Sequence, residues 1–110
     1  MIHKMKLVDF AFDAIKNGTK DIEIRLNDEK RRLINIGDKI EFTNIDNGDI
    51  ILVDVINLHH FDSFNDLFDT FPNKRLGLND TDNASIMNNF YTKEEEKEYG
   101  VLGIEIRINI

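Results

Sequence analysis

The chain has 110 residues, of which 41% are apolar and 32% charged, so it can build one hydrophobic core and a single domain over residues 1–110. It contains no cysteine, which excludes disulfides and thiolate sites and fits a reducing compartment. The net charge of −7 argues against a protein that coats nucleic acid without regard to sequence, because such binding needs excess lysine and arginine.

The positive charge is concentrated near the start of the chain. Residues 1–39 carry nine Lys and Arg against seven Asp and Glu, whereas residues 40–110 carry five against fourteen. The acidic second part is a candidate surface for a protein partner. No stretch is long and apolar enough for a signal peptide or a membrane span, so we expect a cytoplasmic protein without a membrane partner. Sixteen isoleucines and thirteen asparagines indicate an AT-rich bacterial genome.

The first predicted elements are a strand over residues 3–7 and a short helix that ends at Asn17-Gly18, where glycine accepts the backbone conformation of a helix exit. A half-buried strand follows, in which polar residues alternate with apolar ones. The apolar row is Ile22, Ile24 and Leu26, and the polar row is Asp21, Glu23 and Arg25. The polar row must therefore face solvent or a cleft.

The middle of the chain predicts two further strands. A charged turn over residues 27–32 leads to an alternating stretch over residues 38–43. Asn47-Gly48 predicts a tight two-residue hairpin turn, because both residues accept positive φ angles. The run over residues 50–58 is apolar on both faces near its start, which is typical of a central strand.

The last third predicts helices and a closing strand. Phe61, Phe64, Leu67, Phe68 and Phe71 recur at helical spacing before Pro72, so this helix should carry most of the aromatic core.

A second helix should place Ala84, Met87 and Phe90 inward, and Thr92 opens a capping box for a final turn or two. Alternation over residues 102–110 then predicts a strand. Together these elements predict an α+β fold with a small curled sheet or barrel of mixed strand order and helices outside.

Three blocks of the sequence resemble one protein family. Residues 18–25 match the G-x-K-x-x-E-x-R pattern of the ASCH domain family, a branch of the PUA-like superfamily. Residues 26–31 with 37–42, and residues 99–106, look like that family in order and spacing. The resemblance implies a PUA-like mixed β-barrel of about five strands with peripheral helices. It also implies a cleft beside the 18–25 segment and binding of RNA or a modified nucleoside.

A bacterial branch of that family hydrolyses the acetyl amide of N4-acetylcytidine with a lysine, a threonine three residues later and a later glutamate. In this chain Lys20 stands in the lysine place, but Glu23 stands in the threonine place. If the chain is an amidohydrolase or a ribonuclease, Lys20 and Glu23 are its candidate catalytic residues. We favour a binding module over these enzymes.

Glu23 and Arg25 lie two residues apart on a predicted strand, so their side chains leave the same face about 7 Å apart. A carboxylate accepts hydrogen bonds from base amino groups, and a guanidinium fits a phosphate or a base edge. The pair therefore suits one flipped or single-stranded nucleotide. The alternative is a surface ion pair, worth under about 1 kcal/mol.

Lys20 lies at the start of the same strand and can lean across the mouth of the cleft. Burial there would favour its neutral form and make it a base, whereas an exposed lysine would contact a phosphate or simply be solvated. The sequence leaves this choice open.

Other residues are candidates for contacts around this cleft. Lys30, Arg31 and Arg32 crowd one turn and can follow a nucleic-acid backbone, although a solvated turn explains them equally well. Tyr99 can line the cleft or pack in the core. His59-His60 lacks the spacing of a metal pair, so we predict no metal and no other cofactor.

Overall fold

The computed structural model describes residues 1–109. Its strands are β1 (Ile2–Leu7), β2 (Ile22–Leu26), β3 (Lys39–Asn44), β4 (Ile50–Phe61) and β5 (Val101–Ile108). The helices are α1 (Asp9–Lys16), α2 (Phe64–Thr70) and α3 (Lys93–Tyr99), with the 3₁₀ helices η1 (Arg31–Leu33), η2 (Asn73–Leu76) and η3 (Ala84–Asn89). None of the helices in this described part has the length and apolar character to span a bilayer.

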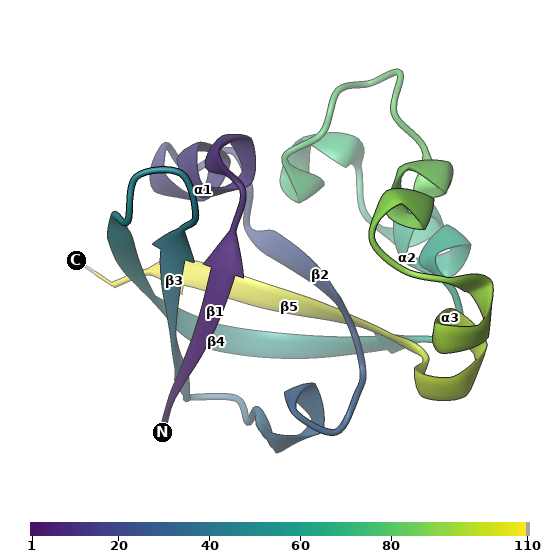
Figure 1. Cartoon of the computed structure of the whole chain (residues 1–110), viewed down its shortest axis with the longest axis horizontal. Coiled ribbons are helices and arrows are strands. Elements are labelled where there is room, and N and C mark those ends of the chain that lie inside the picture. The colour runs from purple at the N-terminus through teal and green to yellow at the C-terminus, as the bar shows by residue number, and fades with distance from the viewer. Residues whose placement is uncertain (110) are drawn as a thin grey trace.

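The strands form one mixed, curled sheet with the order β1-β3-β4-β5-β2 (Figure 1). β1 and β3 run parallel, and the other neighbours are antiparallel. β4 is therefore the central strand, as its two-sided apolar run predicted. β1 and β2 are the two edges of the sheet, and the curl is that of a half-barrel. The predicted α+β fold, with a small curled sheet of five strands in mixed order and peripheral helices, is confirmed.

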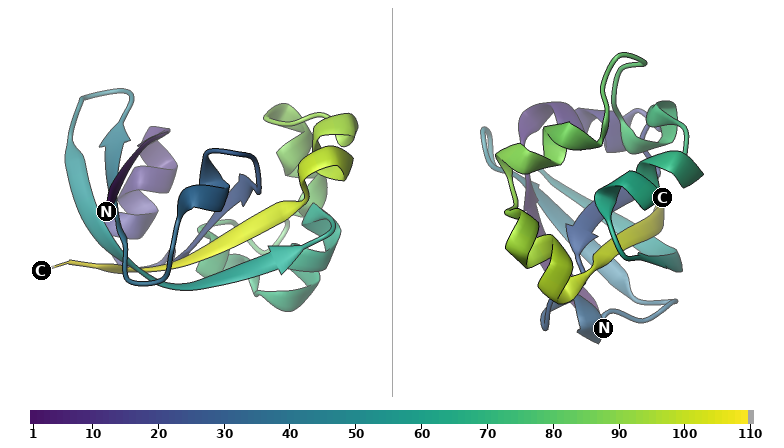
Figure 2. Two further views of the ribbon diagram at one scale, coloured as in Figure 1. Left: turned by 90° about the horizontal axis from the view of Figure 1, so that it is seen from below. Right: turned by 90° about the vertical axis from the view of Figure 1, so that its right-hand side faces the viewer.

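The core has two parts, one on each side of β5. The first lies between α1 and the strands β1, β3, β4 and β5, and Phe12 and Ile15 of α1 fill it. The second lies between β2 and the helices α2, η2 and η3, and Phe64, Leu67 and Phe71 contribute its aromatic and aliphatic bulk. Figure 2 shows α1 at one end of the curled sheet and α2 and α3 gathered at the other.

β2 has the predicted alternation. Ile22, Ile24 and Leu26 belong to the second core cluster. The opposite row carries Glu23 and Arg25, and the Arg25 guanidinium reaches the backbone of β1. β2 thus uses its apolar row to pack on the helices and turns its charged row toward the gap between the two sheet edges.

The expected two-residue hairpin turn is wrong. Residues 45–49 join β3 to β4, and within the described residues only glycines have positive φ, so Asn47 cannot occupy such a turn. Buried Asn44 closes the larger loop: its backbone N–H donates to the carbonyl of Asp49 and its carbonyl accepts from the amide of Gly48, at 2.8 Å each. Its side chain also donates to Asp9 at 2.8 Å, which ties the loop to α1.

Two details near the carboxyl end also differ from expectation. Phe90 was expected inward with Met87, but η3 is a 3₁₀ helix that ends at Asn89, so the helical spacing stops before Phe90. Met87 is buried and Phe90 is 57% exposed. The predicted closing strand is β5, which ends at Ile108, and its expected last residue, Ile110, lies outside the described residues.

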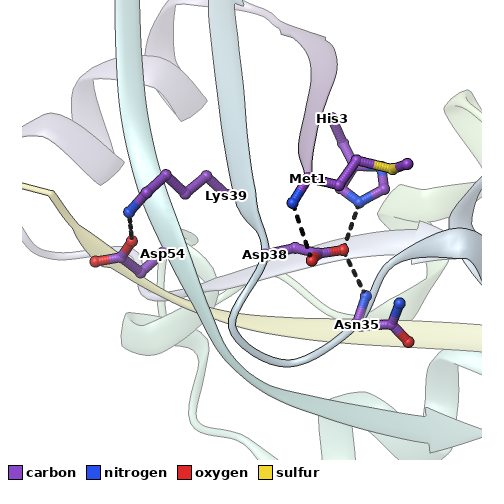
Figure 3. Close-up of polar contacts among 6 residues, drawn as sticks. All are labelled: Met1, His3, Asn35, Asp38, Lys39 and Asp54. Carbon is purple, nitrogen blue, oxygen red and sulfur yellow. Dashed lines mark hydrogen bonds and ion pairs between the residues drawn. The ribbon is translucent and has the colours of Figure 1, made fainter.

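Asp38 ties the start of β1 to the loop before β3 (Figure 3). One carboxylate oxygen of Asp38 lies 2.8 Å from Nε2 of His3 and accepts a hydrogen bond from the amide of Asn35 at 3.0 Å. The other lies 3.4 Å from the amino group of Met1. The hydrogen bond with His3, together with that from Asn35, lowers the pKa of Asp38 to about 2.

We predict that Asp38→Asn lowers the melting temperature at neutral pH. Since the folded-state pKa of Asp38 is about 2, below the 3.8 of a free aspartate side chain, its carboxylate stabilises the fold fully above about pH 4, and this contribution is lost as the pH falls through 2. Thermal unfolding of wild type and variant between pH 7 and pH 2 should show a difference in melting temperature that becomes smaller below pH 4. Asp80→Asn, at an exposed position, is the matched control. A difference independent of pH would contradict the role of this carboxylate.

Candidate ligand-binding site

A cavity of about 270 Å³ opens between the two sheet edges. Residues of β1, α1, β2, η2 and η3 line it, together with Ile45, Leu78, Phe90 and Tyr91 from loops. Most of its wall is apolar. The charged exceptions are Lys6, Lys20, Glu23 and Arg25. The three polar residues of the 18–25 segment singled out in the sequence therefore converge on one cavity.

Lys20, Glu23 and Arg25 form a contiguous ion cluster at this cavity, here called the Lys20–Glu23–Arg25 cluster. Nζ of Lys20 lies 3.2 Å from Oε1 of Glu23, and Nε of Arg25 donates to Oε2 of Glu23 at 2.8 Å. Lys20 is only 7% exposed and Glu23 4%. Both carboxylate oxygens are thus engaged by cations, in an environment that largely excludes water.

The electrostatics keep Glu23 and Arg25 ionised. Burial by itself raises the pKa of Glu23, but Lys20 and Arg25 outweigh it, so the pKa lies below its usual value. Burial likewise opposes the charge of Arg25, but the Glu23 carboxylate raises the pKa of the guanidinium. Glu23 is therefore a carboxylate in an ion pair, and the surface ion pair considered from the sequence is instead a buried one.

Lys20 is fixed by the segments on either side of β2. Its backbone amide donates to Ala14 at the end of α1 at 2.9 Å, and Nζ donates to the carbonyl of Leu76 at 3.0 Å. Gly77 follows with φ of +73°, and a Cβ there would lie 3.0 Å from Cδ of Lys20. Glycine is required here because the chain leaving η2 turns through the left-handed region directly against the lysine stem.

Arg25 links the two edges of the sheet. Its Nη2 donates to the backbone carbonyl of Lys6 on β1 at 2.8 Å, while its Nε holds Glu23 on β2. Since β1 and β2 share no ladder of hydrogen bonds within the described sheet, this side chain bridges the open side of the half-barrel next to the cavity.

Aromatic side chains form the rim of the cavity. Phe10 of α1 and Phe90 are each 57% exposed, although both line it. Tyr91 is half-buried and stacks on Phe64, with ring centroids 5.6 Å apart and planes at 18°. Burial raises the pKa of Tyr91, so its hydroxyl stays protonated at neutral pH.

The sequence analysis missed these three aromatic residues. Phe10 lies off the apolar stripe of its helix, and Phe90-Tyr91 directly precedes the capping box at Thr92. Two features of the sequence could have pointed to these residues as part of a binding surface. One is an aromatic residue on the polar side of a short helix, and the other is an aromatic pair in a loop.

The other predicted contact residues lie outside the cavity wall. Lys30 and Arg32 are exposed, and Nε of Arg32 donates to the carbonyl of Asn27 at 2.8 Å. Nη1 of Arg31 lies 3.3 Å from Oδ2 of Asp28. Tyr99 packs against the second core cluster. Contact of these four residues with a ligand remains a prediction.

The histidine pair lies near the end of β4. Nε2 of His59 lies 2.9 Å from Oε1 of Glu105, and the His59 ring meets Phe71 edge-on. Within residues 1–109, no group of three or more His, Asp or Glu side chains is arranged to hold a metal ion.

We predict that Arg25→Met destabilises the protein by about 3 kcal/mol, because Oε2 of the buried Glu23 carboxylate and the carbonyl of Lys6 both lose the guanidinium that donates to them. Chemical denaturation measures this loss. The double variant Glu23→Gln/Arg25→Met should lose less than the sum of the two single losses, because the contact between Glu23 and Arg25 can be lost only once.

Arg107→Met is the matched control for this change, because Arg107 is an exposed arginine on β5 outside this cavity. It should alter stability by less than about 0.5 kcal/mol. Equal losses in Arg25→Met and Arg107→Met, or additive losses in the double variant, would show that the cluster does not couple energetically.

Comparison with known proteins agrees with this architecture. Residues 5–109 match the family model of the ASCH domain. No curated protein matches the chain. The crystal structure of the hypothetical protein PH0355 is 32% identical, with 99% of this chain and 100% of that chain covered and a TM-score of 0.85. The solution structure of PF0455 from Pyrococcus furiosus is 33% identical, with 98% and 97% covered and a TM-score of 0.77.

A more distant likeness supports the fold alone. The crystal structure of a mutant ZmASCH protein from Zymomonas mobilis is 13% identical, with 96% of this chain and 67% of that chain covered and a TM-score of 0.65. The family model spans all five strands except the first residues of β1. On the strength of this match and of two relatives above 30% identity, the chain belongs to the ASCH domain family.

Proposed function

We propose that the cavity binds one nucleotide unit, either of RNA or of a free, modified nucleoside or nucleotide. The observation that supports this most is the pairing of buried Lys20 and half-buried Arg25 with an exposed aromatic rim at one cavity. Cationic donors recognise phosphate oxygens or the acceptor atoms of a base edge. Aromatic rings stack on the face of a base, whichever base it is.

In this proposal Glu23 orients the two cations. Both of its oxygens already contact Lys20 or Arg25, so it keeps the donors 3.2 Å and 2.8 Å away on either side. Its remaining lone pairs can still accept from a base amino group, as expected from the sequence, but its first role is to fix Lys20 and Arg25 before a ligand arrives. Such preorganisation lowers the cost of binding.

The size of the cavity favours a single unit. A volume of about 270 Å³ lies at the lower end of the range for small-molecule sites. It suits one base with its sugar or phosphate and not a duplex. A longer strand would have to cross the protein surface, where Lys30, Arg31 and Arg32 are our proposed contacts for its backbone. Their contribution would appear as a dependence of strand affinity on salt concentration.

A hydrolase acting through Lys20 and Glu23 is less well supported. The lowered pKa of Glu23 makes its carboxylate a weak general base, and the place of the threonine in the hydrolytic branch is occupied by Glu23 itself. Incubation with N4-acetylcytidine and with short RNAs, followed by mass spectrometry, tests this alternative. Unchanged substrates would overturn it, and release of acetate or cleaved RNA would replace our proposal with an enzyme.

We predict that Phe90→Ala weakens nucleotide or short-RNA binding by about tenfold, because stacking on one aromatic side chain contributes about 1–3 kcal/mol per base. Isothermal titration calorimetry with a panel of nucleosides, nucleotides and short single-stranded RNAs measures the affinity. The melting temperature should hardly change, since Phe90 is already exposed.

Leu33→Ala serves as the control, because Leu33 is an exposed apolar side chain that does not line the cavity. It should leave the affinity unchanged. An equal effect of both substitutions, or wild-type protein that binds no member of the panel, would refute the proposed function.

A further inference from the structure

The cavity carries a charge opposite to that of the protein. The whole chain has a net charge of −7, yet the charged residues of the wall are Lys6, Lys20, Glu23 and Arg25, which sum to +2. No other acidic side chain lines the cavity within the described residues. A local positive excess on a protein that is otherwise acidic favours an anionic ligand at this wall.

One of the two excess positive charges lies at the buried end of the cavity, in the Lys20–Glu23–Arg25 cluster, and the other is carried by exposed Lys6. Lys20 is 7% exposed, whereas the aromatic residues Phe10 and Phe90 at the rim are 57% exposed. Glu23 balances only one of its two neighbours, since Lys20 and Arg25 share a single carboxylate. An excess cation beside an apolar wall is costly unless a counter-charge approaches it. The buried end is therefore complementary to an anionic group.

We propose that the ligand is a nucleotide with a terminal phosphate monoester, whose phosphate faces Lys20 and Arg25 and whose base lies against the aromatic rim. This inference rests on the proposed function of the same cavity and names the class of its ligand. The ligand can be a free nucleoside monophosphate or the phosphorylated end of an RNA strand, because both present the same group.

A monoester fits the closed end better than an internal phosphodiester does. It has three free acceptor oxygens and a charge of about −1.5 to −2 at neutral pH. An internal diester carries one negative charge and has an ester substituent on each side. The buried end would therefore need space for two substituents to leave it. A monoester has one substituent, which can lead out to the rim.

The experiment compares matched ligands by calorimetry at 0.15 M salt. The panel holds each nucleoside, its 5′- and 3′-monophosphates, and one trinucleotide with either a phosphate or a hydroxyl at its terminus. The phosphorylated member of a matched pair should bind at least about tenfold more tightly, and the preference should persist in salt because buried charges are weakly screened. A phosphorylated trinucleotide that binds more tightly than its mononucleotide identifies a strand end as the source, and the reverse identifies a free nucleotide.

Lys6→Glu tests the charge argument without disturbing the buried cluster, because Lys6 is exposed and only its backbone carbonyl contacts Arg25. The change takes the charge of the wall from +2 to 0 and should reduce the preference for the phosphorylated ligand over its nucleoside several-fold. Lys97→Glu makes the same charge change at an exposed position of α3 outside the cavity, and should leave the preference intact.

The two proposals fail in different ways. Equal affinity for nucleosides and their monophosphates would overturn the anionic ligand class and leave the nucleotide site standing. Absence of binding to every member of the panel would overturn both. A loss of preference in Lys97→Glu equal to that in Lys6→Glu would attribute the effect to net charge and would also overturn the inference.

Discussion

The buried carboxylate of Glu23, held between Lys20 and Arg25, is the interaction on which the site depends. Without both cations, burial would favour its neutral form; with them its pKa is lowered, and it fixes one donor on each side. Arg25 extends the constraint to the backbone of β1, so the same contacts that order the donors also join the two open edges of the sheet. The closure of the sheet edges and the arrangement of the cavity wall therefore depend on one cluster, which is costly to bury.

The sequence predicted those features that depend on local pattern. The alternation at Glu23 and Arg25 fixed which row of β2 is apolar, because side chains of a strand point to opposite faces in turn. The two-sided apolar run over residues 50–58 indicated the central strand, and β4 is central in the sheet although Ile50 in that run is 60% exposed. The helix that follows was predictable from phenylalanine spacing, although Phe61 belongs to the end of β4.

Features that depend on contacts between distant segments were not predictable in this way. The position of Lys20 depends on Leu76 and Gly77, more than fifty residues away, and no local sequence pattern predicts that contact. The aromatic rim comes from α1 and from the loop after η3, two segments that only the curl of the sheet brings to one cavity. Tyr99 packs against the second core cluster and outside the described cavity wall, so its contact with a ligand remains a prediction.

A crystal structure of the protein with a bound nucleoside 5′-monophosphate tests the central claim most directly. The account predicts that Arg25 and Lys20 both contact Glu23, and that the ligand lies between this cluster and Phe90, with its phosphate on the side of the two cations. A structure in which Arg25 turns away from Glu23 into solvent, or in which the ligand lies outside this cavity, would contradict it.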